Sequence, residues 1–409
     1  MMICRYNVKC DTCNEPFTLR ISIGHSEMQE HIILCSKCGE EMIIALHLDQ
    51  KKATVRIEYA DNCSEIEKDG SIVNLHPEFI VPDELRNQDG ASVSIMRSME
   101  LFQKVDRAKL EEIYNEENLE TIGNNAYAIF QTDVEWKSLN KAWSQFNKEN
   151  YSLANEIVNQ NSKNFMIEGD TVEEWIFSFC QRLLSPNYTY LFADAIHVIA
   201  ELRKEKPREF SRFLAYHNKE LYLNNLKRNH EIFKEFYQVY NDMKAILLHF
   251  KINGNTPIDG DVSSFNFRKT KKLYGDIFES LTVNFSTLAL ISNIKKGRCF
   301  EHFEKMDINK YLTIDKAGRS KCFEDIKEFA AISNCLNSTI RNASHHASFD
   351  YNYRTGLIHY RSGGDGSKQT MSYVEYVRYC VSIFLSSVTM MCIEIMLQHI
   401  YDSYDRQTN

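Results

Sequence analysis

The hydrophobic pattern is strand-like near the N-terminus of the chain. Residues 17–23 alternate apolar and polar side chains, which predicts a half-buried strand. Residues 42–48 and 53–59 have a similar pattern and are joined by a short polar segment, which predicts a hairpin. Residues 62–95 show no regular period, so we expect an irregular connector there.

From about residue 96 the apolar spacing becomes helical. The clearest linker is residues 254–261, which contain two glycines and a proline. Residues 349–372 are polar and Gly-rich, and they predict an insertion without a helix. Helices are expected at residues 101–114, 175–184, 274–294, 326–340 and 373–401. The fold class predicted is therefore mainly α, with a small β-rich N-terminal part.

Composition and charge narrow the classes of function. The chain is 43% hydrophobic and 25% charged, as in a soluble globular protein. Residues 251–409 hold 20 Lys and Arg against 17 Asp and Glu, which leaves 28 against 39 in the first 250 residues. A polyanion is therefore expected to bind toward the C-terminal end, and a DNA-binding N-terminal module is disfavoured.

Neither a secretory signal nor a membrane span is apparent in the sequence. The longest charge-free apolar stretch, residues 379–393, is shorter than the ~20 residues that a span requires. The 12 cysteines are scattered along the chain, which fits a reducing compartment rather than a disulfide framework. We therefore expect a cytoplasmic protein with no membrane partner.

Two Cys-x-x-Cys pairs near the N-terminus predict a metal site. The pairs are Cys10/Cys13 and Cys35/Cys38, and the strand-like residues 17–23 lie between them. Four thiolates complete a closed tetrahedral zinc site, whose role is structural because no coordination position stays open. The alternative is a set of free thiols or a redox pair. Other residues that could replace one ligand are Cys4, His25 and His31.

A second group of polar residues occurs where a predicted helix ends. Arg341, Asn342, His345 and His346 fall within six positions, and Asn342 and His346 share a helix face because they are four residues apart. An imidazole can move a proton near neutral pH, and a guanidinium can hold a phosphate oxygen. These groups suffice for metal-independent RNA cleavage, with His346 as general acid or base, Arg341 stabilising charge and Asn342 orienting them.

The run Arg341-Asn342-x-x-x-His346 resembles the signature of HEPN domains, an Arg and a His separated by four to six residues with Asn after the Arg. The resemblance covers roughly residues 265–400. It implies a small helical bundle, a homodimer that joins two Arg/His pairs in one cleft, and ribonuclease activity in phage defence or in a toxin restrained by an antitoxin or regulator. Ser348 stands where one toxin subtype carries Tyr, so this chain departs from that subtype.

Other roles for these residues stay open at this point. His345 is a rival for His346, and a metal site of His345, His346 and Asp350 is conceivable. Glu279 and Asp276 are candidates for the polar residue that HEPN folds place beside the Arg/His pair. Basic residues at the two ends of the preceding helix could guide an RNA backbone: Arg268, Lys269, Lys271, Lys272, Lys295, Lys296 and Arg298.

Together these observations predict four consecutive segments. They are a zinc ribbon with a hairpin (residues 1–60), a connector (61–95), a helical middle region of unknown role (96–253) and a HEPN-like domain (262–403). The expected function is a HEPN-type endoribonuclease that leaves 2′,3′-cyclic phosphate ends and needs only a structural zinc. The alternative is a non-catalytic, zinc-containing dimerisation or sensor protein that uses the HEPN fold for binding.

Overall fold

The computed structural model describes residues 2–24, 26–49, 52, 54–78, 80–82, 90–91, 132–165, 167, 169–345, 349–361 and 366–408. The chain divides into two compact units, each built from three separate segments. Unit 1 comprises Met1–Asn118, Val239–Leu273 and Thr339–Val381, and unit 2 comprises Leu119–Gln238, Tyr274–Ser338 and Ser382–Asn409. The prediction of a mainly α protein with a small N-terminal β region is confirmed. The helix predicted at residues 101–114 lies outside the described residues.

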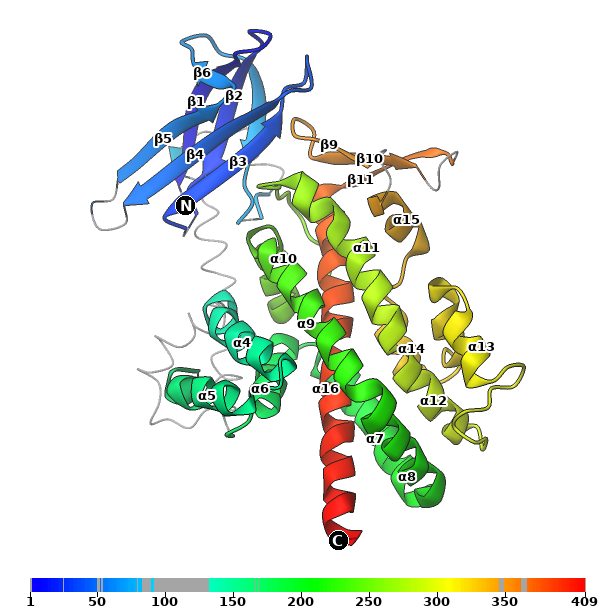
Figure 1. The fold of residues 1–409 in the computed structure, drawn as a ribbon. Coiled ribbons are helices and arrows are strands. Elements are labelled where there is room, and N and C mark those ends of the chain that lie inside the picture. The colour runs from blue at the N-terminus through cyan, green and yellow to red at the C-terminus, as the bar shows by residue number, and fades with distance from the viewer. Residues whose placement is uncertain are drawn as a thin grey trace. The chain divides into compact units, whose positions relative to one another are not determined.

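The N-terminal part of unit 1 consists of two β-sheets, drawn in blue in Figure 1. One sheet has the strand order β6-β1-β2-β7, with β8 also paired to β1, and the other has the order β3-β4-β5. The strands are β1 (Met2–Cys10), β2 (Pro16–Ser22), β3 (Met28–Leu34), β4 (Glu41–Asp49), β5 (Thr54–Asp61), β6 (Cys63–Glu65), β7 (Ser71–Leu75) and β8 (Gly90–Ala91). The strand and the hairpin predicted for residues 17–59 are thus confirmed.

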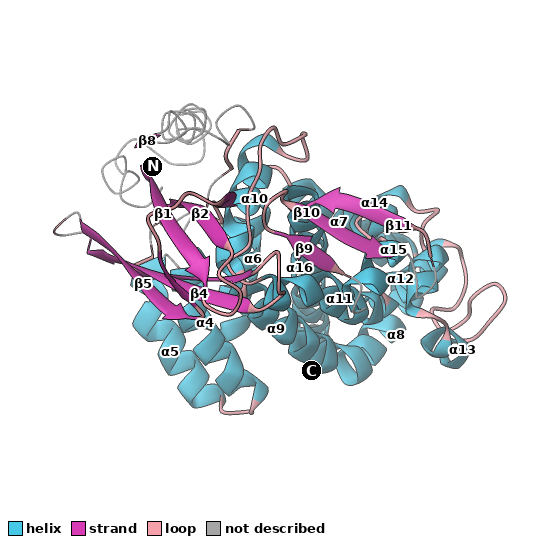
Figure 2. Cartoon of the chain, turned by 90° about the horizontal axis from the view of Figure 1, so that it is seen from above, coloured by secondary structure: helices cyan, strands magenta, loops and turns pink. Residues whose placement is uncertain are grey.

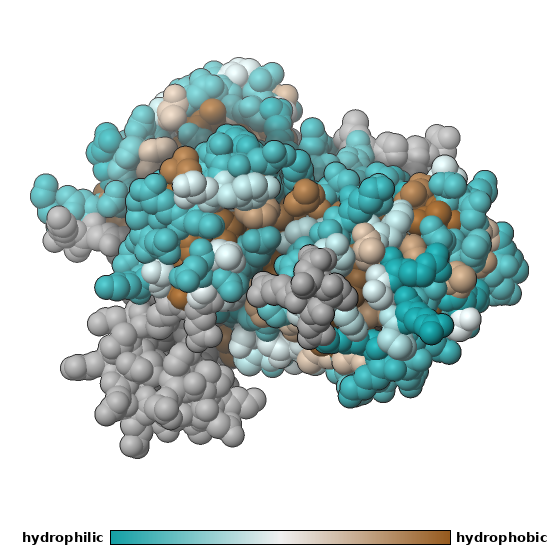
Figure 3. All heavy atoms as spheres, turned by 60° about the horizontal axis from the view of Figure 1, so that its bottom comes forward, coloured by the Kyte–Doolittle hydropathy of each residue, from teal (hydrophilic) through white to brown (hydrophobic). Residues whose placement is uncertain are grey.

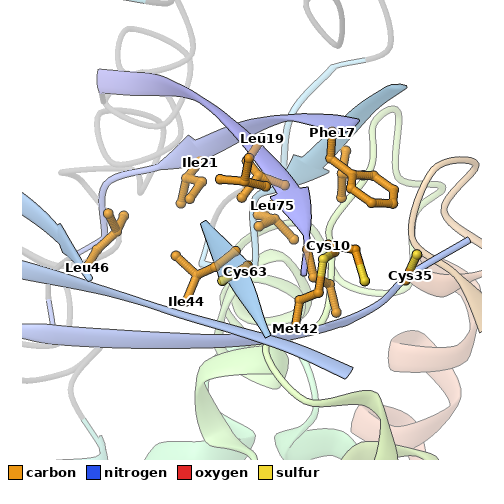
Figure 4. Close-up of a cluster of buried hydrophobic side chains, with 13 residues drawn as sticks. Cys10, Phe17, Leu19, Ile21, Cys35, Met42, Ile44, Leu46, Cys63 and Leu75 are labelled. Atoms are coloured by element: carbon orange, nitrogen blue, oxygen red, sulfur yellow. The ribbon is translucent and has the colours of Figure 1, made fainter. Parts of the chain in front are cut away.

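A single cluster of buried apolar side chains lies between these two sheets. Leu19 and Ile21 of β2 face Ile44 and Leu46 of β4, and none is more than 1% exposed. Figure 4 shows this cluster and shows the sulfur atoms of Cys10 and Cys35 at one end of it. Burial of each such side chain contributes about 1.5–3 kcal/mol. Cys10 and Cys35 therefore belong to this apolar core.

The expectation of an irregular connector at residues 62–95 is wrong for its first part. β6 pairs antiparallel with β1, and β7 pairs parallel with β2, so both are members of the first sheet. Their three and five residues are too few for a period of two to stand out in the sequence. Backbone pairing with the edges of β1 and β2, and not the residue pattern of β6 and β7, decides that these segments are strands.

Unit 1 also contains a second small sheet and the helix α10 (Tyr240–Asn253). The polar, Gly-rich insertion predicted at residues 349–372 contains the antiparallel sheet β11-β10-β9, which the sequence did not predict; it is shown in magenta with the other strands in Figure 2. Its strands are β9 (Asp350–Asn352), β10 (Leu357–Arg361) and β11 (Lys368–Ser372). One face of these strands is buried, at Tyr351, Ile358 and Met371, but three to five residues are too few for the alternation to stand out in the sequence.

A buried carboxylate holds the residues that follow the linker of unit 1 against its helices. Asp242 of α10 accepts hydrogen bonds from Thr270 Oγ1 at 2.8 Å, Tyr373 Oη at 2.6 Å and the backbone NH of Phe265 at 3.0 Å, and also from Ser264. Burial raises the pKa of this carboxyl, although each of these donors favours its charged form. Because four donors surround this carboxylate, its role is structural.

Unit 2 is helical in its described part. Two helices extend into it from unit 1, α11 (Phe267–Asn284) and α16 (Tyr373–Thr408). The other helices are α4 (Thr132–Asn147), α5 (Tyr151–Phe165), α6 (Val172–Leu184), α7 (Thr189–Glu205), α8 (Pro207–Tyr216), α9 (Tyr222–Gln238), α12 (Ser286–Lys295), α13 (Ile308–Thr313) and α14 (Lys327–Ser333), with a π-helical turn η3 (His217–Leu221) and a 3₁₀ turn η4 (Lys316–Cys322). The helix predicted at residues 175–184 corresponds to α6.

Aromatic side chains form much of the core of unit 2. Trp136 stacks on Tyr237 with ring centroids 4.9 Å apart, and Trp143 stacks on His230 at 4.8 Å. Phe236 of α9 stacks face to face on Phe384 of α16 at 3.6 Å. Offset and stacked aromatic pairs add about 0.5–1.5 kcal/mol each beyond their buried area. These aromatic side chains therefore belong to the hydrophobic core of unit 2.

The single helix predicted for residues 326–340 is interrupted. α14 ends at Ser333, and a separate helix, α15 (Ser338–His345), begins five residues later. The hydroxyl of Tyr274 holds the break, because it donates to Cys335 O at 2.7 Å and accepts from the NH of Asn337 at 2.7 Å. A tertiary contact, which the local sequence does not reveal, therefore decides where α15 begins.

Two helical stretches are long and apolar enough to cross a membrane by length and composition alone. They are Phe267–Lys295 and Tyr373–Tyr404, and 83% and 89% of their apolar windows are already buried inside the protein. Such burial is typical of core helices as well. The large exposed apolar side chains, such as Met28, Tyr190 and Leu223, are far apart in the sequence, and Figure 3 shows apolar residues in small separate areas on the face drawn.

Candidate functional site

The four predicted cysteines come together at one end of the core of unit 1. The ligand atoms of Cys10, Cys13, Cys35 and Cys38 all lie within 4.8 Å of one another. In the described part of the chain, no other group of three or more His, Cys, Asp or Glu side chains meets this condition. Cys10 and Cys35 are buried, Cys13 is half-buried and Cys38 is exposed. The site therefore lies at the surface, with its inner side against the apolar core.

The two Cys-x-x-Cys segments repeat the same backbone geometry. In the first, the NH of Asn14 donates to Cys10 O at 2.8 Å, and the NH of Cys10 donates to Glu15 O at 3.0 Å. In the second, the equivalent bonds run from Gly39 to Cys35 at 2.9 Å and from Cys35 to Glu40 at 2.8 Å.

Asn14 and Gly39 both have positive φ, 58° and 78°. Gly and Asn are the residues that adopt this conformation most readily, so each turn can close after its second cysteine.

The sulfur positions fit a tetrahedral metal. A zinc–sulfur bond of about 2.3 Å requires neighbouring sulfurs about 3.8 Å apart. Here Cys10 Sγ lies 3.7 Å from Cys38 Sγ, and Cys13 Sγ lies 3.5 Å from Cys35 Sγ. None of the cysteines forms a disulfide. Four cysteines close together are thus compatible with a structural metal site.

Electrostatics around the sulfurs also favour a cation. Burial raises the pKa of the Cys13 thiol. Burial acts on Cys35 in the same direction, but backbone NH groups of Cys38 and Lys37 point at its sulfur and hold its pKa below the ordinary value. Thiols this close to one another resist becoming thiolates together unless a positive charge lies between them. A metal ion bound by the four sulfurs would supply that charge.

Asn62 is a neighbour of the cysteines that spacing does not reveal. Its Oδ1 accepts from the NH and the hydroxyl of Thr12 at 3.1 and 2.8 Å. Its Nδ2 donates to Glu41 O at 2.7 Å and lies 3.8 Å from Cys10 Sγ. One side chain therefore connects the first cysteine turn to β4, which follows the second turn. Asn62 has a φ of 50°, a left-handed backbone conformation that Asn adopts more readily than most residues.

The other residues considered as ligands are not part of the cysteine cluster. Cys4 lies elsewhere on β1 and interacts with Tyr6. His31 is fully buried and stacks on Phe265 with ring centroids 4.9 Å apart. Burial lowers the pKa of His31 to about 3, so its imidazole is neutral. His25 lies outside the described residues.

Helix α15 carries part of the second predicted site. Arg341 Nη1 donates to Asn342 Oδ1 at 2.8 Å, so the guanidinium is held by the next side chain. Arg341 and Asn342 are half-buried, and His345 is exposed at the end of the helix. His346 and Ser348 lie outside the described residues. Asp350 begins β9 and is exposed.

The acidic residue proposed to support this site has a different partner. Glu279 of α11 forms an ion pair with Lys316 of η4, with Oε2 and Nζ 2.5 Å apart. Asp276 lies near Glu235, and burial together with Asp276 and Glu231 raises the pKa of Glu235 to about 7. Both acids belong to unit 2, whereas Arg341 belongs to unit 1.

The basic residues suggested for RNA binding fall into two groups. The three in unit 2 interact with side chains of that unit: Lys295 with Glu201 at 2.9 Å, Lys296 with Asp325 at 2.6 Å, and Arg298 with Asn293 at 3.3 Å. Of those in unit 1, Arg268 pairs with Glu41 at 2.7 Å. The adjacent Lys269, Lys271 and Lys272 are surface residues, and Lys271 is the most buried of them.

The chain was compared with protein-family models, curated proteins and solved structures, and none of them matches it. Interpretation of its function therefore depends on the two sites themselves.

Proposed function

We propose that this protein is a metal-independent endoribonuclease of HEPN type, with Arg341 and His346 as its reacting groups. The observation that carries the proposal is the hydrogen bond from Arg341 to Asn342 on α15. This bond orients the guanidinium of Arg341, and His346, whose imidazole can exchange protons, follows five residues later in the sequence. A fixed, planar guanidinium suits two oxygens of one phosphate.

The reaction that these groups can perform is transesterification followed by release. One imidazole removes the proton of a ribose 2′-hydroxyl, and the 2′-oxygen attacks the adjacent phosphorus. The bond from phosphorus to the 5′-oxygen breaks, and that oxygen takes a proton from an imidazolium. The products are a 2′,3′-cyclic phosphate and a 5′-hydroxyl. Arg341 stabilises the negative charge that grows on the phosphoryl oxygens.

The resemblance to HEPN domains extends the proposal to the assembly. A homodimer would supply two Arg/His pairs, so that one imidazole acts as base and the other as acid. A defence or toxin role in the cytoplasm would then require a trigger, a regulator or an antitoxin. Under this proposal the dimer forms through the C-terminal domain.

The proposal also assigns zinc to the four-cysteine site. Zinc accepts four thiolates in a tetrahedron without a preferred distortion, and the sulfur spacings suit its bond length. The ion would hold the two cysteine turns together and would take no part in RNA cleavage. Its role is therefore structural.

The test compares three single variants with the parent protein on a defined single-stranded RNA. His346→Ala should reduce cleavage by at least about 10²-fold and His345→Ala should not, since proton transfer contributes 10²–10⁴-fold. His359→Ala removes an exposed imidazole of β10 and is the matched control. Reactions contain no Mg²⁺, the zinc content of each protein is measured, and RNA ends are sequenced for cyclic phosphate.

Other outcomes would decide against the proposal. Cleavage by His346→Ala at the parental rate would show that the proposed imidazole is not used. If neither the parent protein nor any variant cleaves RNA, and the protein is a zinc-bearing homodimer in solution, the non-catalytic dimerisation or sensor protein is favoured. A loss of toxicity on expression that is confined to His346→Ala would support an effector role.

A further inference from the structure

A surface cavity of about 550 Å³ lies in unit 2, between α11, η4 and α14. Its volume is within the range of about 300–1,000 Å³ that small-molecule sites occupy. Phe278 of α11, which is 1% exposed, forms part of the floor together with Ala330 of α14. Ala317 and Leu336 add further apolar atoms to a lining that also contains polar side chains. This cavity is called the α14 cavity below.

The rim of the α14 cavity is polar and negatively charged. Ser320, Glu324, Ser333, Asn334 and Ser338 line it, and none of the described lining residues is a Lys, Arg or His. The side chains of Glu324 and Asn334 are exposed and have no hydrogen bond or ion pair within the described part of the chain. They are free to pair with a ligand. A carboxylate accepts hydrogen bonds only, so it favours a neutral group that presents hydrogen-bond donors.

We propose that the α14 cavity binds a guanine base of single-stranded RNA, with Glu324 as the residue that selects it. This inference rests on the proposed ribonuclease activity for the identity of the ligand as RNA. Guanine presents two adjacent donors, N1–H and the 2-amino group, which match the two oxygens of one carboxylate. Its O6 is an acceptor beside them, which suits an amide NH of Asn334.

The other bases fit this rim less well. Adenine and cytosine each present one amino donor beside an unprotonated ring nitrogen, which would face a carboxylate oxygen and repel it. Uracil offers a single NH between two carbonyls. Proteins that read RNA sequence bind unstacked bases by their Watson–Crick edges, usually against an aromatic or apolar surface. In the α14 cavity the apolar contact would come from Ala317, Ala330 and Leu336.

The cavity also has a connection in the chain to the proposed reacting groups. Ser338 lies on its rim and is the first residue of α15, three residues before Arg341. Three residues of α-helix rise about 4.5 Å. RNA that is held at Ser338 is therefore bound by the helix that carries the guanidinium. The proposal predicts that cleavage depends on a guanosine near the scissile phosphate.

The experiment measures nucleoside binding directly, on the full-length zinc-loaded protein, by calorimetry with guanosine, inosine and adenosine. Guanosine should bind most tightly. Inosine lacks the 2-amino group and should bind about 10-fold more weakly, because one carboxylate oxygen loses its donor. Glu324→Gln should weaken guanosine binding by about 10- to 100-fold and should reduce the difference between guanosine and inosine.

Two further variants complete the test. Glu304→Gln removes an exposed carboxylate of unit 2 that does not line the cavity, and it should bind guanosine as the parent does. Asn334→Ala removes the amide that would read O6 and should weaken guanosine more than adenosine. Both positions are exposed, so the fold should survive, and circular dichroism would verify this.

The possible results separate this inference from the ribonuclease proposal. Guanosine binding that depends on Glu324, in a protein that cuts no RNA, would support the cavity and overturn the nuclease. RNA cleavage at the same positions by the parent and by Glu324→Gln would keep the nuclease and overturn the cavity. Equal affinity for guanosine and adenosine, or no binding of either at millimolar concentration, would also overturn the cavity.

Discussion

The four-cysteine site and the α15 site differ in how far their local sequence determines them. Each Cys-x-x-Cys segment closes its own turn through backbone hydrogen bonds that span five or six residues, and both turns use a residue with positive φ. α15 has only eight residues, and a hydroxyl from α11 marks the break before it. A metal site built from local turns can be recognised by spacing, whereas a site at the end of a short helix depends on distant contacts. The following predictions test this difference.

Replacement of one metal ligand should have the largest effect. Cys35→Ser removes a buried thiolate, so the metal should be lost and the β-sheets of unit 1 should become less stable by roughly several kcal/mol, since structural zinc contributes folding energy directly. The measurement is zinc stoichiometry together with thermal unfolding.

Cys63→Ser is the matched control for that change. Cys63 is also buried and is paired with Cys10 across β6 and β1, but it is not a member of the cluster. This variant should retain its zinc. Loss of zinc from Cys63→Ser but not from Cys35→Ser would show that the ligand set is wrong.

Changes on α15 should leave the metal in place and reduce cleavage. Arg341→Lys keeps the positive charge but loses the planar pair of donors, so cleavage should fall by about 10²-fold or more, as when one donor to the transition state is removed. Asn342→Ala keeps the guanidinium but removes one of its hydrogen-bond acceptors, so a smaller loss is expected.

RNA cleavage rates under single-turnover conditions test this order. Equal rates for the parent and Arg341→Lys would mean that only charge matters at this position. A loss of zinc in either variant would contradict the independence of the two sites.

Removal of the Asn62 amide should weaken metal binding without abolishing it. Asn62→Gly tolerates the positive φ but loses the bonds to Thr12, Glu41 and Cys10. The affinity for zinc should fall by about 10- to 100-fold, as is typical when a group behind a metal ligand is removed.

Competition with a chromophoric chelator measures this affinity. Asn14→Gly makes the same replacement at another left-handed position, where the side chain is exposed, and it should bind zinc as the parent does. A similar loss in both variants would assign the effect to backbone freedom and not to the amide.

The smallest effect concerns acid stability of unit 1. Burial lowers the pKa of His31 to about 3, whereas the unfolded chain takes up a proton near 6.5. The stability linked to His31 is therefore fully present above pH 6.5 and is lost as pH falls from about 6.5 to 3. His31→Phe keeps the stack on Phe265 and should make unfolding less dependent on pH in this window.

The free energy of unfolding is measured at several pH values for the parent and for His31→Phe. Both proteins carry the same four cysteines, so the difference between their pH profiles gives the contribution of His31. His47→Phe changes a partly exposed imidazole of β4 and is the control. Parallel pH profiles for the parent and His31→Phe would contradict the assignment.

Much of the secondary structure was predictable wherever a periodic pattern was long enough. The strands β2, β4 and β5 and the helices α6 and α16 follow the predicted ranges closely. The short strands β6, β7 and β9 to β11 were missed, because three to five residues carry little periodic signal. The break between α14 and α15 was missed for a different reason, since apolar spacing continues across it while Tyr274 interrupts the backbone.

The sequence by itself determined which four cysteines lie together and the turns that present them, because these depend on spacing and on backbone bonds within a few residues. It also identified the Arg341-Asn342 pair on one helix. Only the tertiary structure decided that Asn62 joins the cysteine turns, that Glu279 and Lys295 are engaged with their own chain, and that η4 and α14 enclose a cavity. Each of these contacts connects residues far apart in the sequence, so no local pattern encodes them.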